Sequence, residues 1–112
     1  CCEGKLDKCI IKWHDKKSVC IVICSKGYPD TFKKNLLIKN IEKIKLTKNE
    51  YLYHAGTTKI NNEVFSSGGR VLNFVCLSED FLKARTKIVN LINQLDWKNG
   101  FYRKDIGYKV IN

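Results

Sequence analysis

The residue types best suited to chemistry in this chain lie between residues 54 and 70. Gly68 and Gly69 immediately precede Arg70, which is one of only three arginines. Residues without side chains let backbone N–H groups approach an anion, and arginine can bind phosphate or carboxylate through two parallel hydrogen bonds. The Gly-Gly-Arg sequence therefore predicts an anion-binding site. A β-bulge that carries a solvated arginine is the alternative interpretation.

His54 begins the same stretch and is followed by alanine, Gly56 and Thr57. Imidazole titrates near neutral pH and a glycine beside it would let a substrate approach, so a general base is one interpretation. A histidine that ends a strand is more often a hydrogen-bonded structural residue. A Cys–His nucleophilic pair is disfavoured because the nearby cysteines lie in apolar runs. A catalytic role for His54 is therefore disfavoured, and we predict no catalytic residue.

A β-hairpin would bring these two sites together. Residues 50–54 alternate as expected of a strand, and Asn61 and Asn62 can adopt the positive φ values of a primed turn. The return strand would then place residues 66–70 beside residues 54–57. The two glycine-containing sites are therefore predicted to be neighbours.

Two apolar strands flank this hairpin. Residues 18–25 are rich in β-branched side chains and apolar on both faces, which predicts a central strand covered on each side. Residues 71–77 predict a second strand that holds the preceding arginine at the rim of a sheet. Residues 26–30 predict a rigid, exposed loop, because Gly27 permits unusual backbone angles and Pro29 fixes its own φ.

An amphipathic helix is predicted over about residues 79–96, with Ser78 as its N-cap. Its apolar positions recur every three or four residues, as expected of a helix that packs one face on a sheet. These positions are Phe81, Ala84, Ile88, Leu91, Ile92 and Leu95. Residues 101–110 are expected to form a last strand or an extended tail. Residues 31–49 have no clean period, and within them residues 36–38 suit a short strand.

The N-terminal residues are expected to connect this domain to a preceding one. The sequence begins with cysteine and contains no methionine, so no translation start is visible and the chain is expected to be a piece of a longer protein. Residues 1–8 are predicted to end a helix of the preceding domain, with Gly4 at its C-terminal cap. Residues 9–14 are predicted to form an edge strand on which Trp13 packs.

Composition limits the possible classes of protein. A length of 112 residues with 44% hydrophobic content suits a single domain, residues 1–112, with one modest core. The net charge of +10 raises the alternative of a basic α+β module that binds nucleic acid. That alternative is disfavoured because the charge comes mainly from scattered lysines, whereas direct base readout favours arginine.

The six cysteines and the hydropathy pattern indicate a soluble protein with free thiols. Cys20, Cys24 and Cys76 lie in apolar runs and are expected in the core, and no Cys-x-x-Cys pair is present to begin a zinc site. The longest apolar run covers residues 19–24, which is far below the roughly 20 residues of a membrane-spanning helix. We predict no metal site and no membrane partner.

Four motifs have an order and spacing that is more specific than any one of them. They are Ser25-Lys-Gly-Tyr-Pro29, Tyr53-His-Ala-Gly-Thr57, Gly68-Gly-Arg-Val-Leu72 and Phe101-Tyr-Arg-Lys-Asp-Ile-Gly107. From Gly4 onward the chain closely resembles the C-terminal domain of phosphoribosylamine–glycine ligase, an enzyme of the ATP-grasp superfamily that is also called glycinamide ribonucleotide synthetase. One departure is Asn61-Asn62, where relatives often have an aspartate-glycine turn.

This resemblance implies an α+β domain, mainly antiparallel sheet with one long helix, whose strands close one side of an active-site cleft. It implies a cytoplasmic enzyme of purine biosynthesis that joins glycine to 5-phosphoribosylamine with ATP. ATP and Mg²⁺ (or Mn²⁺) would be bound by the other ATP-grasp domains, outside this chain. Glycine, 5-phosphoribosylamine and those domains are therefore the expected partners, and nucleic acid is not. The chain alone is expected to be inactive.

The same resemblance implies three loops that face the cleft. The implied substrate-binding residues are Lys26, Gly27, Tyr28, Pro29, His54, Gly56, Thr57, Gly68, Gly69 and Arg70. Arg70 and the glycine backbone, helped by Lys26, are the best candidates to hold the phosphate of the ribosylamine or the carboxylate of glycine. Lys26 and Arg103 could each bind an anion or simply be solvated at the surface. Asp105 could orient Arg103 through an ion pair or lie on a strand without such a role.

Overall fold

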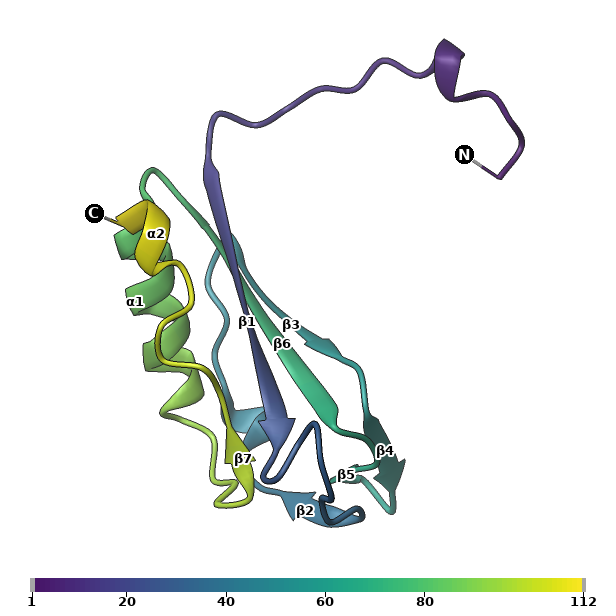
Figure 1. Ribbon diagram of the computed structural model, residues 1–112, viewed down its shortest axis with the longest axis vertical. Coiled ribbons are helices and arrows are strands. Elements are labelled where there is room, and N and C mark those ends of the chain that lie inside the picture. Colours follow the sequence, from purple (N-terminus) through teal and green to yellow (C-terminus); the bar gives the residue numbers. More distant parts are fainter. Residues whose placement is uncertain (1, 112) are drawn as a thin grey trace.

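The computed structural model describes residues 2–111, which form two antiparallel sheets and one long helix (Figure 1). The larger sheet has the strand order β3-β6-β1-β7, and the smaller sheet has the order β2-β5-β4. The strands are β1 Lys17–Ser25, β2 Leu36–Ile38, β3 Glu50–His54, β4 Thr57–Ile60, β5 Glu63–Ser66, β6 Arg70–Ser78 and β7 Gly100–Phe101. The helices are α1 Phe81–Ile92 and α2 Tyr108–Ile111, with 3₁₀ turns η1 Leu6–Lys8 and η2 Ile41–Lys43. This architecture confirms the predicted α+β class.

The antiparallel pair β1–β6 is the centre of the larger sheet. Both strands are nine residues long; β1 is rich in β-branched side chains, and β6 carries valine, leucine and phenylalanine, which also suit a pleated surface. Their register runs from Lys17 opposite Ser78 to Ile23 opposite Leu72 and then skips one residue, so that Cys24 lies opposite Arg70. This β-bulge falls where β6 begins, and it changes which face the first residue of β6 presents.

Helix α1 covers one face of the larger sheet (Figure 1). The core contains alternate residues of the central strands and the apolar stripe of the helix, because successive strand side chains point to opposite faces. The buried members are Val19, Ile21, Ile23, Leu72, Phe74, Cys76, Ala84, Ile88 and Leu91. The helical periodicity in the sequence therefore identified the correct buried face of α1.

The opposite face of the larger sheet, here called the open face, is much less buried. It carries Cys20, Val22, Cys24, Tyr51, Tyr53, Asn73 and Val75, all exposed or half-buried. The prediction that both faces of β1 are covered is therefore wrong, because α1 can cover only one. For the same reason Cys76 is in the core as predicted, whereas Cys20 is exposed and Cys24 is half-buried.

The limits of α1 differ from the prediction at both ends. Asp80, not Ser78, is the N-cap, and its Oδ1 accepts a hydrogen bond of 2.7 Å from the backbone N–H of Lys83. The carboxylate also complements the positive end of the helix dipole. The helix ends at Ile92, four residues before the predicted end.

Within the described residues 2–111, one predicted strand is absent and another is short. Residues 9–14 form an extended arm that leaves the domain, and Trp13 is 88% exposed instead of packed (Figure 1). The predicted strand 101–110 is paired only at Gly100–Phe101 and continues into turns and the single turn of α2. An apolar pattern alone does not form a strand unless a neighbouring edge is available for pairing. That residues 1–8 end a helix of a preceding domain stays a prediction.

The turn and the return strand of the predicted hairpin are present in the smaller sheet, but the first strand of the hairpin is β4, and residues 50–54 pair with β6 in the larger sheet. Asn61 and Asn62 have φ values of +48° and +66° between β4 and β5, as a primed turn requires. The short strand 36–38 is also confirmed, because it pairs with β5. Neither helix in the described residues 2–111 is long and apolar enough to cross a membrane.

The chain passes from the larger sheet to the smaller one at Gly56. Its N–H donates to the carbonyl of Arg70 at 2.9 Å, and its own carbonyl accepts from the N–H of Ser67 at 2.7 Å. A Cβ at Gly56 would lie 2.6 Å from the Arg70 carbonyl oxygen and 2.9 Å from Gly68 Cα. The predicted proximity of the two glycine sites is therefore confirmed, and the contact needs glycine at position 56.

The packing predicts that Phe74 stabilises the fold far more than an exposed apolar residue does. Phe74 is fully buried between the sheet and α1, so Phe74→Ala should lower the free energy of unfolding by about 3–5 kcal/mol. Leu82 is 53% exposed on α1, and Leu82→Ala should change the free energy by no more than about 0.5 kcal/mol. Urea unfolding followed by circular dichroism measures both, and equal losses would contradict this core.

The sheet junction predicts an order of effects for two glycine substitutions. Gly56→Ala places its methyl group against backbone atoms and should cost about 2–3 kcal/mol. A Cβ at Gly68 would meet Gly56 Cα at 3.3 Å, so Gly68→Ala should cost less. Thermal unfolding of the two variants compares them, and a larger loss for Gly68→Ala would refute the described junction.

Candidate functional site

The three predicted loops meet at one end of the larger sheet. In an antiparallel pair the end of one strand lies beside the start of its neighbour, so the loop after β1 adjoins the turn before β6. The end of β3 lies on the other side of β6 and leads into Gly56. The loop 26–29, the segment 54–57 and the turn 67–69 are thus brought together at the lower end of the sheet in Figure 1.

Arg70 lies at this end, in a pocket of about 520 Å³ on the open face. The pocket is lined by Val22, Tyr28, Ala55, Gly69, Arg70 and Asn73, and is called the Arg70 pocket below. The ring of Tyr28 lies directly against Gly69, since a Cβ there would be 2.2 Å from Tyr28 Cδ2. Gly69 is therefore needed for Tyr28 to form one wall of the pocket.

The guanidinium of Arg70 is the positive group of this pocket. Arg70 is exposed, and the ion pairs found within residues 2–111 involve Lys5, Lys83 and Arg103, not Arg70. Burial raises the pKa of the neighbouring Cys24 thiol, and the charge of Arg70 opposes part of that rise. The lining of the pocket therefore includes an arginine, which can form two parallel hydrogen bonds, and the amide of Asn73. This combination suits a phosphate or a carboxylate.

Lys26 and Gly27 serve the neighbouring surface. The Lys26 N–H donates to the carbonyl of Asn99 at 2.7 Å, and its side chain lines a separate pocket of about 410 Å³. That pocket also contains Thr31, Phe32, Lys33, Leu36 and Asn99. Gly27 has φ +100° and its missing Cβ would overlap the Thr31 carbonyl, so only glycine fits there. Of the predicted loop 26–29, Tyr28 alone lines the Arg70 pocket.

His54 points away from Arg70. It is opposite Leu72 in the register and so lies on the α1 side of the sheet, whereas Arg70 lies on the open face. Its Nδ1 is 2.9 Å from Thr57 Oγ1. The pocket it lines, of about 360 Å³, is formed by Ile41, Glu42, His54, Thr57, Lys59, Asn62 and Val64. The two glycine sites are neighbours in the backbone, but their functional side chains face different pockets.

Among the polar residues that line these pockets and were not predicted, Asn73 and Asn62 are the most informative. Asn73 is the only polar residue between Val71 and Leu77, and an amide inside an otherwise apolar strand was a usable signal. Asn62 was assigned only to the hairpin tip, yet it lines the pocket of His54.

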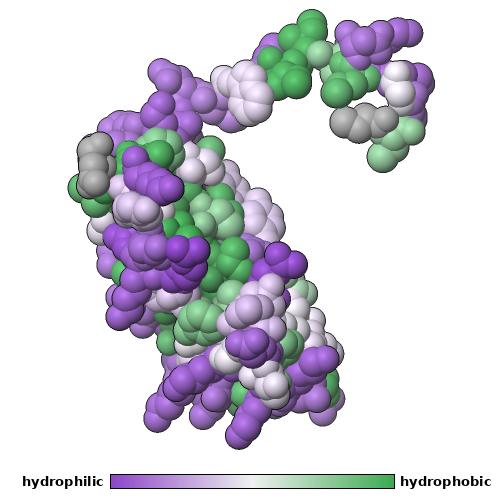
Figure 2. Space-filling view, in the orientation of Figure 1, coloured by the Kyte–Doolittle hydropathy of each residue, from purple (hydrophilic) through white to green (hydrophobic). Residues whose placement is uncertain are grey.

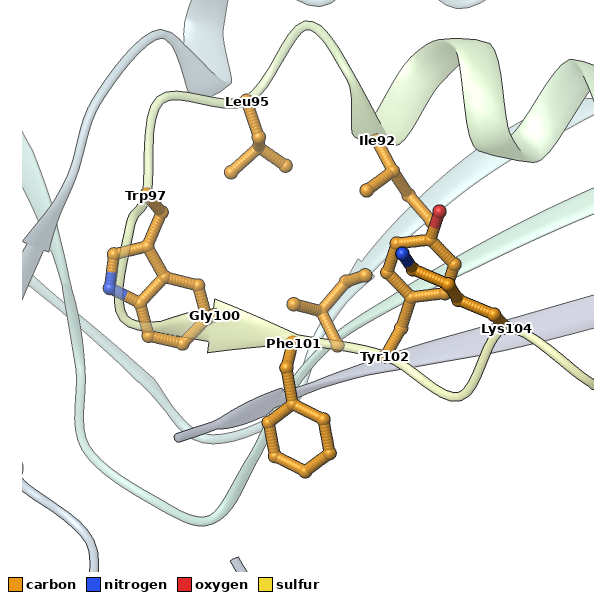
Figure 3. A pocket seen from close by; sticks show the side chains of 8 residues that line it. Ile92, Leu95, Trp97, Gly100, Phe101, Tyr102 and Lys104 are labelled. Atoms are coloured by element: carbon orange, nitrogen blue, oxygen red, sulfur yellow. The ribbon is translucent and has the colours of Figure 1, made fainter. Parts of the chain in front are cut away.

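A further cavity of the domain contains no predicted site residue. It has a volume of about 260 Å³ and lies between the end of α1 and residues 97–104 (Figure 3). Its walls are largely apolar, with Trp97 on one side, Ile92 and Tyr102 on the other, and Leu95 between them in this view (Figure 3). It is therefore a gap in the packing of the C-terminal segment and not part of the three-loop site.

Arg103 and Asp105 form the predicted ion pair at the surface. The Arg103 Nε and Nη2 atoms lie 3.0 and 2.6 Å from the two carboxylate oxygens of Asp105. These hydrogen bonds lower the pKa of Asp105 and raise that of Arg103. Arg103 is thus oriented by its neighbour, and Arg70 is the arginine with a pocket of its own.

The described residues do not provide a metal site. Within residues 2–111, no group of three or more His, Cys, Asp and Glu side chains could hold a metal ion. Hydrophilic residues on the face shown in Figure 2 are spread over the arm, the helices and the lower end of the molecule, with apolar residues between them.

Known proteins are similar to this chain in sequence over nearly its whole length. Phosphoribosylamine–glycine ligase of Brucella melitensis is 33% identical over 109 residues, which is 97% of this chain and 26% of that protein. The ligase of Caldanaerobacter subterraneus is 38% identical over 104 residues, or 93% of this chain and 24% of that protein. A bifunctional purine biosynthetic protein of Dictyostelium discoideum is 39% identical over 113 residues, or 100% of this chain and 14% of that protein. The chain thus spans about a quarter of the length of the bacterial relatives.

A solved structure agrees with the described architecture. The crystal structure of phosphoribosylamine–glycine ligase from Thermotoga maritima matches with a TM-score of 0.66 and 28% identity, over 80% of this chain and 22% of that one. The family model of the phosphoribosylglycinamide synthetase C domain matches residues 18–109, from the first residues of β1 to the start of α2. The chain therefore belongs to the phosphoribosylglycinamide synthetase C-domain family.

Proposed function

We propose that this chain is the C-terminal domain of a phosphoribosylamine–glycine ligase. The whole enzyme would join glycine to 5-phosphoribosylamine with ATP and release glycinamide ribonucleotide, ADP and phosphate in the cytoplasm. The observation that carries this proposal is the family match over residues 18–109, which includes all four motifs completely. It is supported by relatives that are named as this ligase and are matched over nearly the whole chain.

The domain would supply one wall of the substrate cleft. We place ATP and Mg²⁺ (or Mn²⁺) in the other domains of the enzyme, where they would activate the carboxylate of glycine. The roles proposed below for residues 2–111 do not involve contact with ATP or the metal ion. The chain alone is therefore expected to be inactive, and its contribution would be to hold a substrate in the correct position. Alignment of two bound substrates is itself a large part of the rate enhancement of such reactions.

Arg70 is the proposed anchor for an anionic substrate group. Both substrates carry one, the phosphate of 5-phosphoribosylamine and the carboxylate of glycine. The open pocket, the free guanidinium and the adjacent Asn73 amide support this role. Tyr28, held against Gly69, would limit how the substrate can enter. Lys26 and His54 line other pockets, so in this proposal they do not contact the anionic group bound by Arg70.

The Arg70 anchor predicts a selective kinetic defect in the full-length enzyme. Arg70→Ala should raise the KM of one substrate by about 10- to 100-fold, since loss of a charge-assisted bidentate contact is worth about 1.5–3 kcal/mol. Arg70→Lys should recover only part, because lysine cannot form the two parallel bonds. Arg85, whose guanidinium donates to the Lys104 carbonyl on the α1 side, provides the matched control Arg85→Ala. Unchanged KM values for both substrates in Arg70→Ala would remove Arg70 from the site.

The separate pocket of His54 predicts that it is not the general base. His54→Gln and Thr57→Val remove the same hydrogen bond and should have similarly small effects, with kcat reduced less than about fivefold. The pH dependence of kcat should keep its shape in both variants. Loss of a general base would instead lower kcat by about 10²–10⁴ and remove one limb of the pH profile. That result, seen for His54→Gln but not for Thr57→Val, would refute the positional role.

A further inference from the structure

Ser25 lies where the loop 26–29 meets the turn 67–69. It is the last residue of β1 and is 1% exposed, although its side chain is polar. A buried hydroxyl without a partner would be costly, so the way in which Ser25 is satisfied shows what it holds. Its partners all belong to the two loops that border Arg70.

All three polar groups of Ser25 are engaged at this junction. Its N–H donates to the carbonyl of Gly69 at 2.7 Å, and its Oγ donates to the carbonyl of Gly68 at 2.8 Å. Its own carbonyl accepts from the N–H of Tyr28 at 3.0 Å. Ser25 therefore holds two consecutive carbonyls of the turn 67–69, here called the glycine turn, and the backbone of the loop 26–29.

These contacts reach Arg70 from two sides. Gly68 and Gly69 precede Arg70 directly and have no side chains that could hold the turn by packing. Glycine is the most flexible residue, so hydrogen bonds must supply the order that side chains cannot. Tyr28 in turn places its ring against Gly69 and forms a wall of the Arg70 pocket. The approach to Arg70 and one wall of its pocket thus share Ser25 as a support.

We propose that Ser25 is a positioning residue for the Arg70 site. It does not line the pocket, and it would act by keeping the glycine turn and Tyr28 in the arrangement that aims Arg70 at the substrate. This inference rests on the proposed function, because it needs the Arg70 pocket to be a substrate site. A loose turn would leave the charge of Arg70 intact but would require ordering at the moment of binding, which weakens affinity.

Ser66 provides a matched control within the same domain. It is the other buried serine, at 0% exposure, and its Oγ also makes one hydrogen bond to the backbone, accepting from the N–H of Leu36 at 3.2 Å. This bond holds β2 to β5 and does not touch the glycine turn. A purely structural role for Ser25 predicts that Ser25→Ala and Ser66→Ala behave alike. A positioning role predicts that they separate in kinetics.

The test is steady-state kinetics of the full-length ligase with Ser25→Ala, Ser66→Ala, Arg70→Ala and the double variant of Ser25 and Arg70. Ser25→Ala should raise the KM of the substrate that depends on Arg70 by about three- to tenfold, with kcat within about twofold of the parent. Ser66→Ala should leave both KM values unchanged even if its melting temperature falls. In the Arg70→Ala background, Ser25→Ala should add less than about twofold, because a residue that acts through Arg70 has nothing left to position.

Ser25→Cys keeps a weaker donor at the same place and should give a KM between those of the parent and Ser25→Ala. The inference is overturned if Ser25→Ala leaves KM unchanged, if Ser66→Ala raises it equally, or if the effects of Ser25→Ala and Arg70→Ala multiply in full. Failure of the proposed function is a different result: the unmodified full-length protein would form no glycinamide ribonucleotide from glycine, 5-phosphoribosylamine and ATP.

Discussion

The contact between Gly56 and the backbone of Gly68 and Arg70 is the constraint on which the rest of the structure depends. At this point the chain leaves the larger sheet for the smaller one, and the returning strand passes so closely that a methyl group at Gly56 would overlap a backbone carbonyl. The link between β3 and β4 is therefore joined to β6 and to the preceding turn by direct backbone hydrogen bonds. This crossing holds the turn before β6 and the backbone of Arg70 in place.

The position of the Arg70 pocket follows from two further features. The β-bulge at Cys24 and Arg70 places Arg70 on the open face, while α1 occupies the other face. The pocket is therefore accessible because only one side of the sheet is covered. Ser25, at the end of the neighbouring strand β1, then orders the glycine turn through its hydrogen bonds to Gly68 and Gly69. These glycines allow the close backbone approach but are flexible, and the hydrogen bonds limit that flexibility beside Arg70.

Local sequence patterns predicted most strands, the hairpin turn and the helix. The errors arose where the structure depends on pairing between residues far apart in the sequence. The strands around Ile21 and Phe74, the turn at Asn61-Asn62 and the apolar face of α1 could be predicted, because each depends on residues close in sequence. The arm that contains Trp13 has an apolar pattern but no edge on which to pair, so it forms no strand.

The site shows the same division. The meeting of Gly56 with Gly68 could be inferred from the hairpin, whereas the separation of His54 from Arg70 could not. That separation depends on which face of the sheet each side chain occupies, and the bulge that sets the face of Arg70 has no unambiguous mark in the sequence. The role of Asn73 likewise appears only when β6 is placed beside β1.

The most direct test of the central claim is a crystal structure of the full-length enzyme with its product, glycinamide ribonucleotide. In this product the carboxyl of glycine has become an amide, so the account predicts the phosphate of the ligand about 2.7–2.9 Å from the guanidinium of Arg70, with Tyr28 and Asn73 at its sides. A ligand bound elsewhere, with the Arg70 guanidinium in solvent, would contradict it.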